Sequence, residues 1–270
     1  MGAKATGQRP VACRRPTCND CGMSKLAVVT GASSGIGAAT AKQLADAGWD
    51  VVAAARRVDR LQELAASNPR ITPVELDVTS DESVDALVAS LGDRAVHLLV
   101  ANAGGAFDAK HVTDADLDSW RKTYEVNVIG TVRTIRALVP KLRASNDGHV
   151  IVTGSTAGFT VYETGGSYTA AKHGEHALAG TLRLELAGEP IRVSVIAPGM
   201  VKTDEFALVR NAGDAAKAAK VYEGVESPLT ADDVADTIVW VATRPSHVNV
   251  DLLVVRPLAQ AAQHKVVRKP

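Results

Sequence analysis

The sequence predicts an α/β fold with a mainly parallel, doubly wound sheet of seven strands flanked by helices. Short apolar segments alternate with helical patterns along most of the chain, and repeated β–α units of this kind build parallel sheets with right-handed crossovers. The first apolar segment leads directly into a glycine-rich turn and a helix, a common opening of such sheets. With 270 residues, 46% of them hydrophobic, the chain can bury one large core.

Seven segments are expected to form the strands, because each is short and nearly continuous in apolar residues, as strands buried on both faces are. They are residues 25–30, 50–55, 71–76, 96–101, 149–153, 192–197 and 252–255. Helical patterns cover residues 35–47, 57–67, 80–91, 116–143, 166–186 and 231–243. No repeat or long linker interrupts the alternation. We therefore expect one Rossmann-type domain over residues 24–260 and a short tail over residues 261–270.

The stretch from 198 to 228 is the longest without clear strand character. It follows the carboxyl end of a strand, where ligands bind in open parallel sheets. We expect a substrate-covering loop with short helices. The Ala- and Gly-rich residues 212–219 are compatible either with mobility or with an ordinary amphipathic surface helix.

The first 23 residues differ from the rest of the chain. They are basic, lack the apolar core of a signal peptide, and carry all three cysteines, Cys13, Cys18 and Cys21. Three thiolates without a nearby histidine fall short of a structural zinc site, which needs four ligands. We expect a disordered leader, no metal site, and a true start at Met23.

Charge and hydropathy exclude two classes of protein. Lys plus Arg and Asp plus Glu each number 30, so the formal net charge is zero, which argues against a general nucleic-acid surface. No apolar run reaches the roughly 18–20 residues that span a bilayer. The composition agrees with a single soluble enzyme domain. We expect it to be cytoplasmic, to act on a small molecule, and to have no nucleic-acid or membrane partner.

A glycine-rich turn follows the first expected strand. Gly31, Gly35 and Gly37 occur as G-x-x-x-G-x-G between the apolar residues 25–30 and a helical pattern. A strand, a glycine turn and a helix together aim backbone N–H groups and a helix N-terminus at a pyrophosphate. An ordinary strand-to-helix turn is the alternative. The position of the turn favours dinucleotide binding.

Two arginines follow the second expected strand, at the place where a dinucleotide fold meets the adenosine ribose. An acidic residue there would accept from the 2′-hydroxyl and repel a 2′-phosphate, but the chain has Arg56 and Arg57. A guanidinium binds a phosphate through paired hydrogen bonds. Two solvated arginines at a helix start are the alternative, although the helix dipole disfavours positive charge there. We expect NADP(H) rather than NAD(H).

Tyr168 and Lys172 are four residues apart in a helical pattern, and Ser155 precedes the tyrosine by thirteen residues. The i, i+4 spacing puts both side chains on one face of a helix. A phenol has a reference pKa of about 10, and a lysine cation one turn away favours the phenolate. Such a phenol exchanges a proton with a carbonyl or alcohol oxygen near neutrality, and a serine hydroxyl can hold the same oxygen.

Six motifs in order resemble the short-chain dehydrogenase/reductase family over about residues 24–256. They are Thr30-Gly31-x-x-x-Gly35-Ile36-Gly37, Asn102-Ala103-Gly104, Asn127, Ser155, Tyr168-x-x-x-Lys172, and Pro198-Gly199 followed by Thr203. Ala101 stands where the family has a first asparagine. Membership implies a Rossmann-type oxidoreductase that transfers a hydride between a nicotinamide cofactor and a CH–OH group.

The resemblance also implies site roles. Tyr168 is the general acid or base, Ser155 donates to the substrate oxygen, and Lys172 holds the nicotinamide ribose and stabilises the phenolate. Asn127 anchors a water that relays protons to Lys172. The expected cofactor contacts are Gly31, Ser33, Ser34, Gly35, Ile36, Gly37, Arg56, Arg57, Asp77, Val78, Asn102, Ala103, Gly104, Tyr168, Lys172, Pro198, Gly199, Val201 and Thr203. Asp77 brackets the adenine with the Val78 backbone, unless it only begins a helix.

The substrate is indicated by the end of the chain. Residues 247–257 lack the Val-Asp-Gly-Gly turn of acyl-carrier reductases. They resemble instead NADP-dependent 3-hydroxy acid, serine-type and clavulanate-type dehydrogenases, which implies a small alcohol or hydroxy acid and its carbonyl. A broad carbonyl reductase or a 3-oxoacyl reductase is the first alternative. A non-catalytic NADP(H)-binding sensor is an alternative of another class.

Assembly is expected from the family as well. Helices 116–143 and 166–186 resemble those of a four-helix contact between subunits, which implies a homotetramer or homodimer. Val128, Val132, Ile135 and Leu138 supply apolar positions on the first helix. The same side chains could instead face the sheet.

Overall fold

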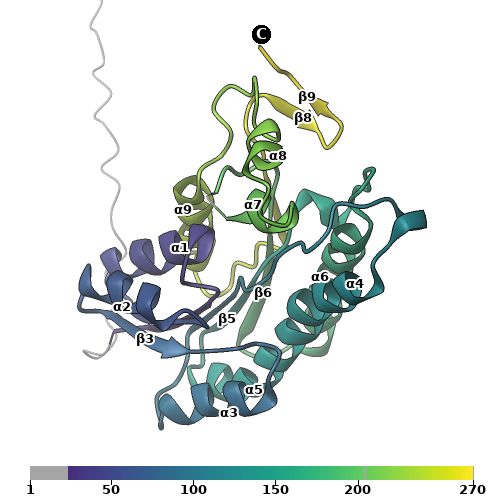
Figure 1. Ribbon diagram of the computed structural model, residues 1–270. Helices are drawn as coiled ribbons and strands as arrows, with labels where there is room; N and C mark the ends of the chain where they lie inside the picture. The colour runs from purple at the N-terminus through teal and green to yellow at the C-terminus, as the bar shows by residue number, and fades with distance from the viewer. Residues whose placement is uncertain (1–23, 204, 270) are drawn as a thin grey trace, which may run out of the picture.

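A computed structural model describes residues 24–203 and 205–269 of the chain. Its central feature is a parallel sheet in the order β3-β2-β1-β4-β5-β6-β7 (Figure 1). The strands are β1 (Leu26–Thr30), β2 (Asp50–Ala55), β3 (Ile71–Glu75), β4 (Leu98–Ala101), β5 (Gly148–Thr153), β6 (Ile191–Pro198) and β7 (Leu252–Val255). The seven predicted strands and the α/β fold class are confirmed. The strand order reverses between β1 and β4, the kind of switch point at which such sheets bind ligands.

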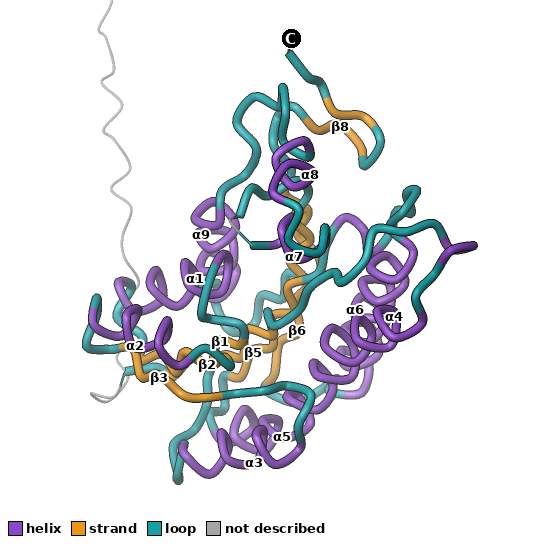
Figure 2. Tube along the Cα trace, in the orientation of Figure 1, coloured by secondary structure: helices purple, strands orange, loops and turns teal. Residues whose placement is uncertain are grey.

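Helices cover both faces of this sheet, so it is the middle layer of three (Figure 2). On one side lie α1 (Gly35–Asp46), α2 (Val58–Ala66) and α9 (Ala231–Ala242). On the other lie α3 (Asp81–Ser90), α4 (Leu117–Tyr124), α5 (Gly130–Ala144) and α6 (Gly166–Glu185). Thr230 begins α9 with a capping box, because its hydroxyl and the Asp233 carboxylate each accept from the other's backbone N–H.

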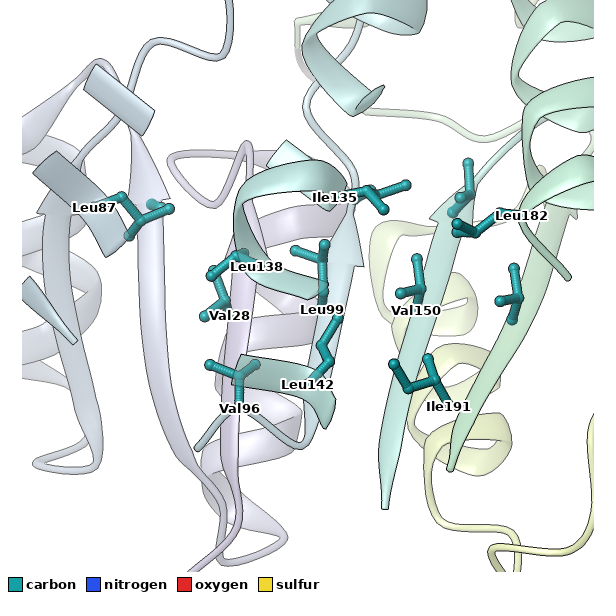
Figure 3. Packing of buried hydrophobic residues seen from close by; sticks show 14 of the residues in the cluster. Val28, Leu87, Val96, Leu99, Ile135, Leu138, Leu142, Val150, Leu182 and Ile191 are labelled. Atoms are coloured by element: carbon teal, nitrogen blue, oxygen red, sulfur yellow. The ribbon is translucent and has the colours of Figure 1, made fainter. Parts of the chain in front are cut away.

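Successive residues of each strand belong to two separate hydrophobic cores, one on each face of the sheet, because neighbouring side chains of a strand point to opposite faces. Val28, Leu99 and Val150 pack with Leu87, Leu138 and Leu182 of α3, α5 and α6 (Figure 3). Their sequence neighbours face α1, α2 and α9; that core includes Ala27, Val29, Val51, Leu98, Val100, Leu44, Leu61 and Ile238. Burial on both faces explains why these strands are apolar throughout.

The helix predicted over residues 116–143 has a break in its hydrogen-bond pattern. Between α4 and α5, residues Glu125–Ile129 form a π-helical turn, η2. The four apolar positions considered for a subunit contact divide: Val128, Ile135 and Leu138 are buried, whereas Val132 is 38% exposed. Most of this apolar surface is therefore used by the core of the domain.

Two segments lie beyond the carboxyl ends of the strands. The stretch 198–228 contains two short helices, as expected, α7 (Phe206–Arg210) and α8 (Ala215–Lys220). The expected tail instead contains an antiparallel hairpin, β8 (Gln260–Ala262) and β9 (Lys265–Val266). Gln260 anchors it, since its buried Oε1 accepts from the Met200 N–H at 2.7 Å. The predicted leader, with its cysteines, lies outside the described residues.

Two short 3₁₀ turns connect other elements, η1 (Val112–Asp114) and η3 (Thr156–Gly158).

Within residues 24–203 and 205–269, no helix has both the length and the apolar character needed to cross a membrane.

Candidate active site

A cavity of about 820 Å³ opens where the strands end, between the glycine turn, the β4 and β5 ends, and the covering segments. It collects nearly all the residues that the sequence predicts for catalysis and cofactor binding. Among those predicted residues, only Gly37 and Asn127 are not in its lining. Gly37 packs beneath the turn, and Asn127 is fully buried in η2.

The glycine turn needs glycine for steric reasons. Gly31 has φ +67°, a left-handed conformation that L side chains rarely adopt. A Cβ on Gly37 would lie 2.3 Å from the Gly31 carbonyl oxygen, so the turn and α1 approach too closely for any side chain. Ser34 is the N-cap residue of α1, but its hydroxyl makes no hydrogen bond to the N–H groups of the helix. The first N–H groups of α1 are thus left for an anion, as a dinucleotide phosphate requires.

Thr30 joins the ends of β1 and β4 beneath the cavity. Its hydroxyl accepts from the N–H groups of Asn102 and Ala103 at 3.0 and 2.9 Å. The Asn102 amide in turn donates to the Thr30 carbonyl at 3.0 Å. Asn102 therefore holds the ends of β1 and β4 together, and the adjoining Ala103 and Gly104 line the cavity.

Arg57 bridges the glycine turn and the covering segment. Its guanidinium donates to Ser33 Oγ and Ser34 Oγ, both at 2.9 Å, and to both Glu205 oxygens at 2.6 and 2.8 Å. The hydrogen bond with Arg57 lowers the pKa of Glu205 and raises the pKa of Arg57. Arg57 can thus hold an anionic group of a ligand beside Ser33 and Ser34, and Glu205 competes with that group for the guanidinium. Arg56 also lines the cavity.

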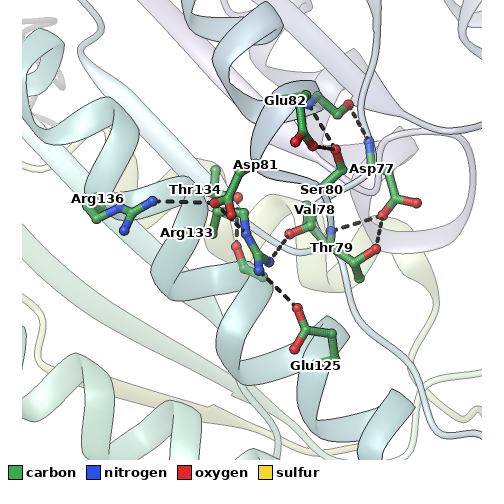
Figure 4. A network of polar contacts seen from close by, with 12 residues as sticks. Asp77, Val78, Thr79, Ser80, Asp81, Glu82, Glu125, Arg133, Thr134 and Arg136 are labelled. Carbon is green, nitrogen blue, oxygen red and sulfur yellow. Dashed lines mark hydrogen bonds and ion pairs between the residues drawn. The ribbon is translucent and has the colours of Figure 1, made fainter.

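The Asp77–Val78 turn is held in place by α5 (Figure 4). Arg133 donates to the Val78 carbonyl at 2.7 Å and contacts Asp81 and Glu125 at 2.9 and 3.0 Å. Asp77 accepts from the N–H and hydroxyl of Thr79. Burial opposes ionisation of Asp77, but these hydrogen bonds and nearby arginines leave its pKa lowered. Both Asp77 and Val78 border the cavity.

Ser155, Tyr168 and Lys172 meet in the same cavity. The Tyr168 ring packs edge-on against Phe206 with centroids 5.4 Å apart, and Lys172 Nζ lies 5.8 Å from the Tyr168 ring centroid. Ser155 Oγ accepts from the Ala157 N–H at 3.1 Å, which leaves its own O–H free to donate. The sequence therefore identified three side chains that the fold brings to one place.

Asn127 lies behind Lys172 in the π-turn. Its amide donates to the carbonyls of Thr123 and Gly105 at 2.7 and 2.8 Å, and its Oδ1 accepts from the Gly105 N–H. A Cβ on Gly104 would lie 2.5 Å from this Oδ1 and 3.7 Å from Lys172 Nζ. π-turns inside helices are frequent at functional sites, and this one sets Asn127 against the cavity wall.

Several lining residues were not predicted from the sequence. Tyr162, Phe206 and Arg210 line the cavity together with Gln263 of the hairpin turn. Arg210 donates to Tyr162 Oη at 3.0 Å and to the Thr164 carbonyl at 3.1 Å. These residues come from segments without helical or strand periodicity, so only the fold shows that they converge.

In the described part of the chain, no three His, Cys, Asp or Glu side chains cluster as metal ligands would. Cys13, Cys18 and Cys21 lie outside the described residues, so the expectation for them is not tested.

Comparison with known proteins gives a consistent result. A family model for short chain dehydrogenase matches residues 25–214. An uncharacterized oxidoreductase of Mycobacterium tuberculosis is 51% identical over 91% of this chain and 96% of its own length. Sulfoacetaldehyde reductase 2 of Chromohalobacter salexigens is 39% identical over 88% of this chain and 96% of its own.

Two further similarities concern enzymes of hydroxy acids. An NADP-dependent 3-hydroxy acid dehydrogenase of Salmonella typhimurium is 35% identical over 87% of this chain and 96% of its own length. The closed form of a serine dehydrogenase complexed with NADP+ is 35% identical and superimposes with a TM-score of 0.84, covering 91% of this chain and all of that one.

Proposed function

The chain belongs to the short-chain dehydrogenase family, and we propose that it interconverts a small hydroxy acid and its carbonyl partner with NADP(H), using Tyr168 as general acid and base. The observation that carries the proposal is the shared cavity. Its lining includes the glycine turn and Arg57 as well as Ser155, Tyr168 and Lys172. The predicted kinship with serine-type and 3-hydroxy acid dehydrogenases is confirmed by the relatives.

The residues of the cavity fit NADP(H). Gly31 and Gly37 allow the backbone to pass close to a pyrophosphate, and the N–H groups at the start of α1 have no side-chain cap. Arg57 can exchange its contact with Glu205 for one with a 2′-phosphate. The predicted preference for NADP(H) is confirmed by the NADP-linked relatives. When bound, this cofactor supplies or accepts the hydride.

The protein's own groups handle the oxygen and its proton. In reduction, Tyr168 donates its phenolic proton to the carbonyl oxygen, and in oxidation the phenolate takes the proton from the hydroxyl. Ser155 donates to the same oxygen and stabilises the charge that develops there. Lys172 stabilises the phenolate by its positive charge and would hold the nicotinamide ribose of a bound cofactor. Thr203 and the backbone near Val201 line the same cavity and would hold the carboxamide.

The substrate class follows from Arg210. Its guanidinium carbon lies 5.2 Å from the Tyr162 ring centroid, and its hydrogen bonds go to neutral oxygens. Among the described residues it has no carboxylate within ion-pair distance. A guanidinium that faces a cavity with donors to spare binds carboxylate or sulfonate oxygens. We therefore assign Arg210 to the acid group of the substrate.

A matched substrate panel tests this proposal. NADPH formation is followed with a 3-hydroxy acid, serine, a hydroxyalkanesulfonate and neutral alcohols of equal length. Anionic substrates should be favoured, and Arg210→Gln should lower their kcat/KM by about 10- to 100-fold, the equivalent of about 1.5–3 kcal/mol, with little change for neutral alcohols. An equal loss for both kinds would reject the role of Arg210 and favour a broad carbonyl reductase.

A binding-only role is the competing function. A sensor of NADP(H) would bind the cofactor without turnover on any member of the panel. The presence of Ser155, Tyr168 and Lys172 in one cavity favours catalysis, and NADPH oxidation with a set of carbonyl compounds, including a 3-oxoacyl thioester, separates the possibilities.

We also propose that the protein is a homodimer or homotetramer. Tyr124, Ile129 and Val132 are 47%, 37% and 38% exposed on the α4–η2–α5 helix, and apolar side chains gathered on one helix suit a subunit contact. Sedimentation should give two or four copies, and a monomer at micromolar concentration would contradict this.

A further inference from the structure

A buried carboxylate touches Lys172, and the roles assigned above do not use it. Glu175 is 2% exposed and lies less than one turn after Lys172 on α6. Its Oε2 and Oε1 accept from Lys172 Nζ at 2.7 and 3.0 Å, and the Thr153 carbonyl accepts at 2.9 Å. Lys172 itself is 5% exposed.

Burial makes each ion of this pair dependent on the other. A buried charge without a partner is strongly unfavourable. Burial opposes the charged form of Lys172, but Glu175 and Tyr168 outweigh it and raise the Lys172 pKa. Burial raises the pKa of Glu175 to about 7, against the opposing effect of Lys172. Above neutrality the pair is therefore ionised, and its two charges offset each other.

The ion pair also limits how many hydrogen bonds Lys172 can donate to a ligand. A lysine ammonium has three N–H donors, and the three contacts to Thr153 and Glu175 use them all. Lys172 can therefore reach a ribose hydroxyl only by releasing one Glu175 oxygen. Glu175 thus controls both the position of Nζ and the number of donors that it offers.

The pair also acts on Tyr168, since Nζ lies 5.8 Å from the ring centroid. A cation at this distance favours the phenolate, and an anion directly behind the cation reduces that effect. Tyr168 therefore experiences a partly neutralised lysine rather than a full positive charge.

We propose that Glu175 is a positioning residue: its carboxylate holds the Lys172 ammonium and offsets its charge, and thereby sets the pH range in which Tyr168 exchanges a proton with the substrate. This inference rests on the proposed function and adds to it the regulation of its proton transfer.

Other charged groups around this part of α6 are engaged elsewhere. Of the elements packed on α6, η3 has no titratable side chain, η2 has Glu125, which pairs with Arg133, and β6 has Arg192, which pairs with Asp147. Helix α4 has Tyr124 beside Gly174. Its Arg121 pairs with Asp118, and its Lys122 lies over the Phe107 ring. On α6 itself, His173 contacts the Thr169 carbonyl, and burial lowers the pKa of His176 to about 4, so His176 is neutral. Glu175 and Tyr168 are the groups that raise the Lys172 pKa.

The test is Glu175→Gln, which keeps the shape and one acceptor oxygen but removes the charge. The readout is kcat/KM for NADP+-dependent oxidation as a function of pH, with the best substrate of the unaltered enzyme. Oxidation needs the phenolate, so the rate rises with pH to a plateau. The glutamine oxygen and the Thr153 carbonyl still accept from Lys172 Nζ, and Tyr168 still favours its charged form, so Lys172 keeps its proton. Without the offsetting anion, the midpoint should then fall by about one pH unit, a tenfold change in proton concentration. The Kd for NADP+ should stay within about threefold of the unaltered value, because Lys172 keeps its charge and has a donor available for the ribose.

Glu189→Gln is the matched control, because this acid pairs with Arg143 on the surface and does not line the cavity. Its midpoint should not move. If Glu175→Gln does not accumulate as folded protein, Glu175→Asp replaces it; its carboxylate lies farther from Nζ, and a smaller fall is expected.

An unmoved midpoint in a folded, active Glu175 variant overturns the inference, because a purely structural role would lower stability or kcat without moving the profile. Absence of turnover by the unaltered protein, or undiminished turnover by Tyr168→Phe, would instead reject the proposed function.

Discussion

Arg57→Gln should convert the chain from an NADP(H)-selective protein to one with little selectivity. Arg57 reaches Ser33, Ser34 and Glu205 with its whole guanidinium, at the cavity edge where a 2′-phosphate would lie. Glutamine keeps some hydrogen-bonding capacity but loses the charge and the paired N–H groups.

The magnitude follows from the exposure of the side chain. A hydrogen bond to a charged group contributes about 1.5–3 kcal/mol, and the Arg57 side chain is 42% exposed, so solvent screening favours the lower end. At about 1.4 kcal/mol per tenfold, the Kd for NADP+ should rise about 10- to 30-fold, while the Kd for NAD+ should change by less than about threefold.

Isothermal titration of both cofactors against the unaltered protein and Arg57→Gln gives these constants. Glu205→Gln is the informative companion, because it removes the internal anion that occupies Arg57 and should tighten NADP+ binding. An unchanged ratio of the two constants in Arg57→Gln would refute the reasoning, and Arg56 would then be the residue that selects NADP+.

Three further outcomes are expected. Gly37→Ala should abolish measurable NADPH binding by fluorescence titration, because the new Cβ would overlap the Gly31 carbonyl; undiminished binding would contradict the packing. Leu138→Ala should lower the free energy of unfolding in urea by about 2–5 kcal/mol, since Leu138 is fully buried; a loss under about 1 kcal/mol would contradict its place in the core. Burial holds the pKa of His149 well below its usual value. The neutral ring's stabilisation is therefore complete above pH 6.5 and is lost as pH falls, by at most about 1.4 kcal/mol per pH unit. Urea titrations of His149→Gln between pH 7 and 5 should show a shallower loss than the unaltered protein, and an equal slope would contradict this origin.

The sequence predicted the sheet and the glycine turn well for a physical reason. Strands buried on both faces must be apolar throughout, so Leu26–Thr30 and its counterparts are visible as continuous runs. The π-turn at Glu125–Ile129 was invisible, because its residues continue the same helical pattern and only the hydrogen-bond register changes.

The candidate site divides in the same way. Tyr168 and Lys172 are adjacent on one helix face, so their spacing predicts contact. Glu205, Arg210 and Gln263 reach the cavity from segments without periodicity, and their convergence depends on long-range packing. Glu175 did leave a signal, because it lies with Tyr168 and Lys172 on a helix face that is otherwise buried and apolar.

The measurement that tests the account most directly is a comparison of Tyr168→Phe with the unaltered protein in two assays, NADPH binding and NADPH oxidation with the preferred carbonyl substrate. The ring keeps its packing against Phe206, so the Kd for NADPH should stay within about threefold. Loss of the only proposed proton donor should reduce kcat/KM by at least about 100-fold. Turnover close to that of the unaltered protein, with binding intact, would contradict the central claim.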